Sequence, residues 1–354
     1  MNRRGWRRAQ LSAALLSTIW FAPPLLGTAR AQDATWTGAT SSNWTTAGNW
    51  SAGVPSGTAT FTNNGAPTSV SIADTVSINT LEFTAAAPAF SFSIGNAATF
   101  TITGGTSNAS AFSPAFTVNT GATLAVGDGA PAEIGSLSGG GTVNIGSAGL
   151  LAIVGNPGTT FSGSFAGAGS LELDDGAALT LTGASNGGNI GTIGGNLTLC
   201  NCDTGGLTIS GGSFTVLGGG FGGGVLVEGG TLAVVNGGTL QIGSSSAPAG
   251  LLVASNMVIS GPGSSVTVTG GPTSIGLFAQ TASLAISNGG VLNSQRGAEI
   301  DAIAFDPSLG QPSVTVTGPG STWNRSRTAC RKSAADTPPR SFTTRLYGST
   351  FTCS

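Results

Sequence analysis

The only adjacent acidic pair in the chain is Asp174-Asp175, and Glu172 lies two residues before it in the run Ser170-Leu171-Glu172-Leu173. If this run is a β-strand, Glu172 and Asp174 share a face, because side chains alternate along a strand. Two carboxylates on one face could serve glycoside hydrolysis as an acid and a base or nucleophile. Asp174-Asp175-Gly176 is also typical of a turn in which Asp bonds to nearby backbone, and we favour the turn.

The side chains on which most enzymes depend are scarce in this chain. It contains no histidine, so a Ser-His-Asp triad, a Cys-His pair and a zinc-protease motif cannot form. Arg296 is the single basic residue between Gln32 and Asn324, and we interpret it as a solvated loop residue rather than a catalytic base. We therefore predict a protein that is not an enzyme, with no catalytic and no cofactor-binding residues. A secreted β-helix enzyme acting on carbohydrate through Glu172 or Asp174 is the alternative.

Metal binding is also not expected. Carboxylates can bind calcium, but the glycine-rich calcium repeat requires a recurring Asp that residues 218–224 lack. Cys200 and Cys202 share one face of a predicted strand, while Cys330 and Cys353 lie near the C-terminus, and zinc would need further ligands nearby. We predict no metal and no cofactor. A Cys200–Cys202 disulfide and two buried thiols both remain open.

Charge divides the chain into three segments. Residues 1–31 contain five arginines and no acid, residues 32–324 contain thirteen Asp and Glu against Arg296, and residues 325–354 contain six Lys and Arg against Asp336. The middle segment therefore has a net charge of −12, which opposes binding to a polyphosphate backbone, so we expect no nucleic acid partner. We predict a signal peptide over 1–31, a β-helical repeat domain over 32–324 and a basic tail over 325–354.

The first segment has the layout of a secretory signal peptide. Four arginines within residues 3–8 precede an apolar stretch over residues 11–21, and Ala29-Arg30-Ala31 provides a small-residue cleavage site. The apolar stretch is shorter than the ~20 residues that span a bilayer, which argues against an uncleaved anchor. We therefore expect export. Because Arg3-Arg4 also matches a twin-arginine signal, the choice between the general and the twin-arginine route stays open.

Short alternating runs recur every eight to twelve residues or so from about residue 68 onward. Examples are Thr99-Phe100-Thr101-Ile102, Thr123-Leu124-Ala125-Val126 and Thr142-Val143-Asn144-Ile145, each bounded by residues that allow sharp turns. Such runs predict strands whose apolar side chains face inward while Thr, Ser and Asn face outward. At roughly twenty residues per coil, residues 33–324 would form about fourteen coils and about 70 Å of length.

The sequence also repeats at a spacing much longer than that of the predicted strands. Residues 232–238 return as residues 284–290, and residues 265–270 return as residues 313–318, at spacings of 52 and 48 residues. Periods of this size indicate solenoids or propellers, in which each unit buries its apolar face against the next. Because insertions and deletions separate the copies, an open solenoid fits better than a closed propeller.

Two parts of the chain carry a resemblance to a known family. The opening contains Trp36-Thr37-Gly38, Ser42-Asn43-Trp44 and Gly48-Asn49-Trp50, and the later repeats end in residues 316–324. Together they resemble bacterial autotransporter passenger proteins with autotransporter-associated β-strand repeats, over most of residues 33–324. The resemblance implies a right-handed parallel β-helix that is exported across the inner membrane and displayed through a C-terminal outer-membrane barrel.

The last segment departs from that family. A transmembrane barrel needs many strands of about ten alternating residues, and nothing of that length follows Asn324, so a membrane link would depend on a barrel absent from this chain. Residues 325–354 switch instead to Arg, Lys, Pro and Cys. We hypothesise a frame shift near Asn324 that truncates a longer passenger-and-barrel gene. A genuine, disordered basic tail is the alternative.

The sequence as a whole predicts an all-β protein, a right-handed parallel β-helix after a signal peptide, that acts as a non-enzymatic, adhesin-like surface protein. Outward hydroxyl and amide groups suit contact with host or bacterial surface glycans or with further copies of the chain, and low charge lets such surfaces approach closely. We expect it at the cell surface or outer membrane of a Gram-negative bacterium, or outside the cell. The adhesion target and the oligomeric state stay open.

Overall fold

The computed structural model describes most of the chain that follows the predicted signal peptide, and it is almost entirely β. The described residues are 31–64, 66–155, 158–183, 188–200, 205–218, 223–276, 282–300, 312–325, 342–346 and 349–353. The predictions for residues 1–30, Cys202 and Cys330 lie outside them. Ala31–Ser354 group into one unit, and its short 3-10 helix η1 spans Ala47–Asn49.

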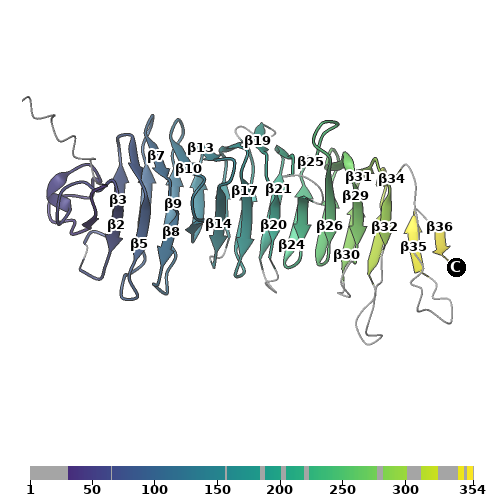
Figure 1. Ribbon diagram of the computed structural model, residues 1–354. Helices are drawn as coiled ribbons and strands as arrows, with labels where there is room; N and C mark the ends of the chain where they lie inside the picture. The colour runs from purple at the N-terminus through teal and green to yellow at the C-terminus, as the bar shows by residue number, and fades with distance from the viewer. Residues whose placement is uncertain are drawn as a thin grey trace, which may run out of the picture. The chain divides into compact units, whose positions relative to one another are not determined.

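Each turn of the chain adds one strand to each of three sheets, which we call the first, second and third faces (Figure 1). The first face is a sheet of thirteen strands. Its strands are β3 Ser69–Ile72, β6 Ser91–Ile94, β9 Ala115–Val118, β12 Ser136–Gly139, β15 Thr159–Phe161, β18 Ala178–Leu181, β21 Gly206–Ser210, β24 Thr231–Val235, β27 Asn256–Ser260, β30 Ser283–Ser287, β33 Ser313–Thr317, β35 Phe342–Leu346 and β36 Ser349–Cys353.

The second face is a parallel sheet of eleven strands. Its strands are β4 Val76–Ile78, β7 Thr99–Ile102, β10 Thr123–Val126, β13 Thr142–Ile145, β16 Ser164–Gly167, β19 Asn189–Ile193, β22 Ser213–Val216, β25 Thr239–Ile242, β28 Ser265–Val268, β31 Val291–Ser294 and β34 Thr322–Arg325.

The third face consists of a four-stranded and an eight-stranded parallel sheet that meet at β8 and β11. The four strands are β1 Ala34–Thr35, β2 Thr58–Phe61, β5 Thr80–Phe83 and β8 Thr106–Asn108. The eight strands are β11 Ala132–Ile134, β14 Leu150–Val154, β17 Ser170–Asp174, β20 Leu197–Leu199, β23 Gly224–Val227, β26 Ala249–Val253, β29 Gly270–Ile275 and β32 Ala298–Ile300.

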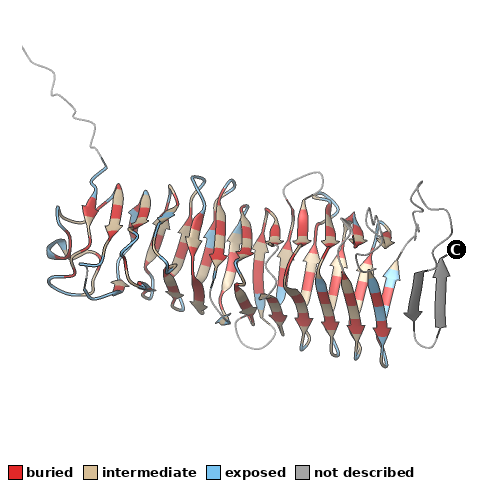
Figure 2. Cartoon of the chain, turned by 90° about the horizontal axis from the view of Figure 1, so that it is seen from below, coloured by how far each residue is buried: buried red, intermediate tan, exposed pale blue. Residues whose placement is uncertain are grey.

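Alternation along each strand separates the core from the surface. In β10, Leu124 and Val126 are buried while Thr123 and Ala125 are half-buried, and the same alternation recurs along the stack (Figure 2). Parallel, in-register pairing sets the inward side chains of successive strands on top of one another and joins them into one continuous hydrophobic core. The predicted parallel β-helix is therefore confirmed.

The number of coils differs from the sequence-based value. Thr159 pairs with Leu179, twenty residues later, whereas Ser283 pairs with Ser313, thirty residues later. The first face from β3 to β33 accordingly defines about ten turns, or about 50 Å at one strand spacing per turn. The prediction of fourteen coils was wrong because it applied a length near that of the shorter coils to the whole chain.

The 52-residue repeat is a repeat of two coils. Leu232 in β24 pairs with Met257 in β27, and Met257 pairs with Leu284 in β30. Leu232 and Leu284 therefore occupy the same position on the first face, two turns apart. Side chains with the same surroundings recur at every second coil in this part of the protein.

The 48-residue pairing was wrong. Ser265 begins β28 in the second face, whereas Ser313 begins β33 in the first face. The residue two turns before Ser313 is Asn256, so the spacing between equivalent positions here is 57 residues. The two similar Ser-Val-Thr-Val-Thr-Gly runs thus build different faces.

The corner between the first and second faces follows the same two-coil period. Ser264 Oγ accepts a hydrogen bond from the Gly237 amide at 3.0 Å and donates one to the Ser260 carbonyl at 2.7 Å. Ser321 repeats this arrangement two coils later, with the Gly289 amide at 3.0 Å and the Thr317 carbonyl at 2.6 Å. Both serines are buried, so each hydroxyl satisfies backbone groups that the corner would otherwise leave unpaired.

Gly191 allows two phenylalanines to meet inside the core. It lies in β19 with φ +104°, and a Cβ there would lie 1.9 Å from the Phe165 carbonyl oxygen. Phe165 and Phe214, in the coils before and after it, pair with Gly191 from either side. Their ring centroids are 5.7 Å apart. A side chain at position 191 would therefore require both backbone strain and displacement of the Phe165 main chain.

A small polar group lies inside the core near β34. Thr273 Oγ1 and Ser294 Oγ are 2.9 Å apart, and Trp323 Nε1 donates to Ser294 Oγ at 3.1 Å. The side chains of Thr273 and Ser294 are almost fully buried. The three groups satisfy one another, as buried polar groups must if they are not to cost stability.

The tryptophan-rich opening forms an aromatic cap on the first coils. The Trp50 ring centroid lies 4.7 Å from that of Trp44 and 5.0 Å from that of Trp36, and the Trp44 ring contacts Phe100 of β7 at 5.1 Å. Trp50 Nε1 donates to the Trp44 carbonyl at 2.7 Å. The cap is therefore a closed cluster of rings, a geometry that stabilises beyond the burial of area alone.

Asn49 fixes the backbone around these rings. Its side chain is fully buried. Oδ1 accepts hydrogen bonds from the amides of Thr40 and Ser41 at 2.9 and 2.8 Å, and Nδ2 donates to Ser41 Oγ at 3.0 Å and to the Asn43 carbonyl at 2.6 Å. One amide side chain therefore uses its full donor and acceptor capacity to hold residues 40–43 against the cap.

Beyond β34, the described part of the tail consists of β35 and β36. β35 pairs in parallel with β33 and antiparallel with β36. No helix among the described residues has the length and apolar character required to cross a membrane.

Candidate functional site

The first face presents an outward ladder of hydroxyl groups. Two in-register series are Ser71, Ser93, Thr117, Ser138 and, further along, Thr160, Thr180, Thr208. Within the first series, Thr117 Oγ1 and Ser138 Oγ lie 3.0 Å apart. Beyond Thr208 the ladder becomes apolar at Ala233 and Val258, so the hydroxyl surface belongs to the earlier coils.

The second face presents an outward ladder of amides and hydroxyls in the later coils. Its in-register members are Thr192, Thr215, Gln241, Thr267, Asn293 and Asn324. Asn324 Nδ2 donates to Asn293 Oδ1 at 2.9 Å, and Asn293 Nδ2 donates to Thr267 Oγ1 at 3.3 Å. The ladder is thus an uncharged row that runs across successive coils, as the outward Thr and Asn positions predicted, and its last three members are joined by hydrogen bonds.

The outward side chains of the third face are not mainly the Thr, Ser and Asn that the sequence predicted. Its outward ladder from β11 to β32 consists of Glu133, Ala152, Glu172, Thr198, Leu226, Leu252, Ser274 and Glu299. It therefore combines carboxylates at both ends with two adjacent leucines in the middle. The sequence pattern did not predict the outward residues of this face. Leu226 and Leu252 lie in runs of apolar residues without alternation, so the sequence does not indicate which side chains point outward.

Glu172 and Asp174 share the outer surface of β17, as predicted, and Cys200 joins them from the next coil. One ligand atom from each of these three side chains lies within 4.8 Å of the others, and Cys200 Sγ donates to Glu172 Oε1 at 2.8 Å. All three residues are partly exposed on the flank of the sheet. Within the described residues, this is the one group of three or more acidic, cysteine or histidine side chains with that spacing.

The turn interpretation of Asp174-Asp175-Gly176 is confirmed. The Asp175 amide donates to Asp174 Oδ1 at 2.8 Å, and the Ala177 amide donates to the Asp174 carbonyl at 2.9 Å. Asp175 adopts φ +49°, a left-handed conformation that Asp tolerates better than most residues. One carboxylate of the predicted acid pair therefore organises a turn after β17.

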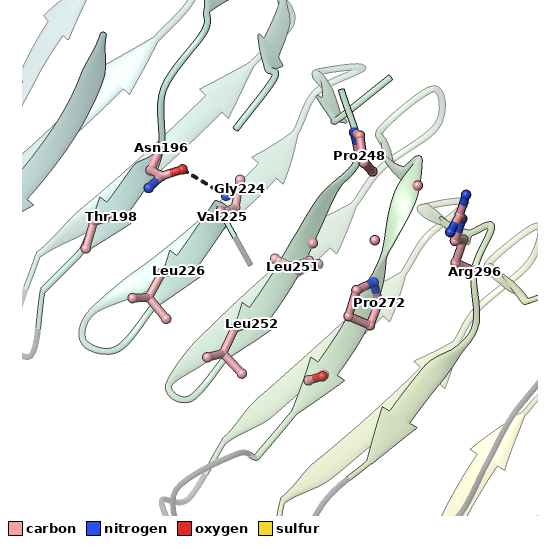
Figure 3. A pocket seen from close by; sticks show the side chains of 15 residues that line it. Asn196, Thr198, Gly224, Val225, Leu226, Pro248, Leu251, Leu252, Pro272 and Arg296 are labelled. Carbon is pink, nitrogen blue, oxygen red and sulfur yellow. Dashed lines mark hydrogen bonds between the residues drawn. The ribbon is translucent and has the colours of Figure 1, made fainter. Parts of the chain in front are cut away.

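A groove of about 430 Å³ crosses the third face at β20, β23, β26 and β29. Leu226 and Leu252 lie on adjacent strands along it, while Pro248 and Pro272 lie at its other side (Figure 3). Glycines form its floor, because Gly224 and Gly250 stand where a side chain would otherwise project, and the Gly224 amide is held by Asn196 Oδ1 at 3.0 Å. The groove is mostly apolar and open to solvent.

Arg296 lies at the rim of this groove (Figure 3). It is exposed, which agrees with the prediction of a solvated residue. Glu172 and Asp174 do not line the groove. The structure therefore does not bring the arginine together with the acid pair.

Comparison with protein-family models, with curated proteins and with solved structures finds no match to this chain. The interpretation of the three faces therefore depends on their own geometry.

Proposed function

We propose that the protein is an exported, adhesin-like surface protein without enzymatic activity, built like the passenger of a bacterial autotransporter. The observation that carries the proposal is the uncharged ladder of the second face, from Thr192 to Asn324. Such a ladder repeats the same donor and acceptor groups at each strand spacing, and a partner with repeated polar groups can contact several rungs at once.

The electrostatics of the ladder favour surface contact over catalysis. Its side chains carry no formal charge, so neither screening by salt nor repulsion between like charges limits close approach. The acid pair lies on another face, where Asp174 accepts from a turn amide and Glu172 accepts from Cys200. Contact with glycans, with other cells or with further copies of the chain follows from the ladder, and the signal-like first segment provides the route of export.

Export and adhesion can be tested with the full chain expressed in a Gram-negative host. We expect the protein outside the inner membrane, with a mature N-terminus close to residue 32. Beads coated with the purified protein should bind bacterial or epithelial cells better than beads coated with albumin. A chain that stays in the cytoplasm, or coated beads that bind no better than the albumin control, would refute the proposal.

Lysine substitutions can identify the surface of the protein that binds cells. T215K with T267K places two cations on the second-face ladder without touching the core, and should lower bead binding several-fold. T198K with S274K places the same charges on outward positions of the third face and is the matched control. Equal loss in both variants would show an effect of net charge rather than of the ladder. Release of reducing ends from polysaccharides that E172Q abolishes would instead support the carbohydrate-active enzyme.

A further inference from the structure

A second cavity lies at the corner between the third and first faces, where β8, β11, β14 and β17 end. Its volume is about 570 Å³, and it extends across four successive coils. The side chains that matter for its chemistry are Asn108, Ser110, Phe112, Glu133 and Asp175. Asn108 and Glu133 belong to β8 and β11, whereas Ser110, Phe112 and Asp175 belong to the turns that follow β8 and β17. None of them lines the leucine-lined groove, so the cavity is separate from it.

Phe112 gives this cavity an exposed aromatic ring. Its side chain is 54% exposed, and among the described residues it is the one large hydrophobic side chain with such exposure. Exposing a ring costs free energy that burial would have recovered. A single exposed apolar residue needs no explanation by itself, so the question is whether its surroundings form a site.

The loop that carries Phe112 is held by its own side chains. Asn108 Nδ2 donates to the Phe112 carbonyl at 3.3 Å, and the Phe112 amide donates to Ser110 Oγ at 3.1 Å. Ser110 Oγ donates in turn to the Ala87 carbonyl at 2.7 Å. The ring is therefore presented by a loop whose backbone is fixed on both sides of it, which lowers the entropic cost of binding a ligand there.

The rest of the cavity supplies hydrogen-bond acceptors. Ser113 Oγ donates to Glu133 Oε1 at 3.4 Å, which orients that carboxylate. Asp175 is exposed and fixed by its left-handed turn. The lining contains no Lys or Arg. A fitting ligand must offer hydroxyl donors to the carboxylates and a flat apolar surface to the ring, and must carry no negative charge.

We propose that this corner cavity binds a neutral oligosaccharide, with one sugar stacked on Phe112 and its hydroxyl groups donating to Glu133 and Asp175. The proposal rests on the adhesive function proposed above and adds to the second-face ladder a separate site with a stated ligand class. Pyranose rings combine an apolar C–H face with a rim of hydroxyl groups, and this is the combination that the cavity complements. Acidic glycans are disfavoured because both carboxylates would repel them.

The test measures binding of the full chain to arrays of neutral and acidic oligosaccharides, followed by titration of the best neutral glycan. We expect F112A to weaken that binding about tenfold or more, the scale of one lost aromatic contact in a small site. F112L keeps an apolar side chain but not the flat ring and should recover only part of the affinity. E133Q removes an ionised acceptor and should weaken binding several-fold.

L252A is the matched control, since it trims a partly exposed apolar side chain on the other cavity. It should leave glycan affinity within twofold of the parent chain, and circular dichroism should show that all variants fold. If F112A and the parent chain bind neutral glycans equally well, the assignment of glycan binding to this cavity is wrong, while the proposed adhesive function is unaffected. Cell adhesion without binding of any neutral glycan would overturn the ligand class alone.

Two further outcomes complete the test. If F112A lowers self-association in light scattering but not glycan binding, the ring is a contact between copies and the proposal is wrong. If the parent chain neither binds glycans nor adheres to cells, the proposed function fails together with the site.

Discussion

Replacing Asn49 by alanine should loosen the aromatic cap selectively. The substitution removes four hydrogen bonds, two accepted by Oδ1 and two donated by Nδ2. A typical intramolecular hydrogen bond contributes about 1 kcal/mol net, which sets an upper estimate of about 4 kcal/mol. The amides of Thr40 and Ser41 belong to exposed residues, so water can replace Oδ1 there, and about 2 kcal/mol is the lower estimate.

Hydrogen–deuterium exchange of the full chain can measure this loss locally. A decrease of about 2–4 kcal/mol in local stability speeds exchange about 30- to 900-fold where opening of the cap limits it. The amides of Thr37 and Trp50 should show the change, while peptides from β24 to β31 should not, because a solenoid couples mainly neighbouring coils. N63A, on an exposed turn, is the control and should change exchange less than threefold. Unchanged protection in N49A would refute the role assigned to this side chain.

Three other substitutions probe the core and the corners. G191A should destabilise the protein by about 3 kcal/mol or more in denaturant unfolding, since it adds left-handed strain to a clash with the Phe165 main chain; a loss below about 1 kcal/mol would show that the backbone of β16 relaxes freely. S294A should cost about 2–4 kcal/mol by leaving buried partners unsatisfied, and T273V with S294A should cost less than the sum of the single variants. S264A and S321A should each cost about 1–2 kcal/mol and add independently, because two coils separate them, and strong coupling would contradict the two-coil description of that corner.

Inward and outward positions were predictable wherever a strand alternates. Leu124 and Val126 are buried in β10 as the pattern requires, and Thr123 and Ala125 face the other way. The assignment of runs to faces was not predictable in this way, because all three faces use the same short alternating strand. The runs that begin at Ser265 and Ser313 are similar in sequence and belong to different faces. The two-coil period is shown instead by the repeat from Leu232 to Leu284 and by the buried corner serines.

The two cavities were missed for a related reason. In β23 and β26 every residue after the glycine is apolar, so the strand pattern contains no sign that Leu226 and Leu252 point outward. Phe112 lies outside any strand, in a loop rich in serine and alanine, where its exposure depends on contacts with Asn108 and Ser110. Alternation is a property of a single strand. The two cavities depend instead on which strands and turns become neighbours when the coils stack.

Stacking in register also explains why the body carries so little charge. Any outward charge stands about 4.8 Å from the same position in the next coil, so like charges on consecutive rungs would repel strongly. On the third face, Glu133 and Glu172 are separated by Ala152, which places the carboxylates about 10 Å apart, close to the screening length at physiological salt. An uncharged ladder avoids this constraint and can run through every coil, as the second face does from Thr192 to Asn324. A composition without histidine and with few charged residues is therefore also a composition that permits a long, uniform polar surface.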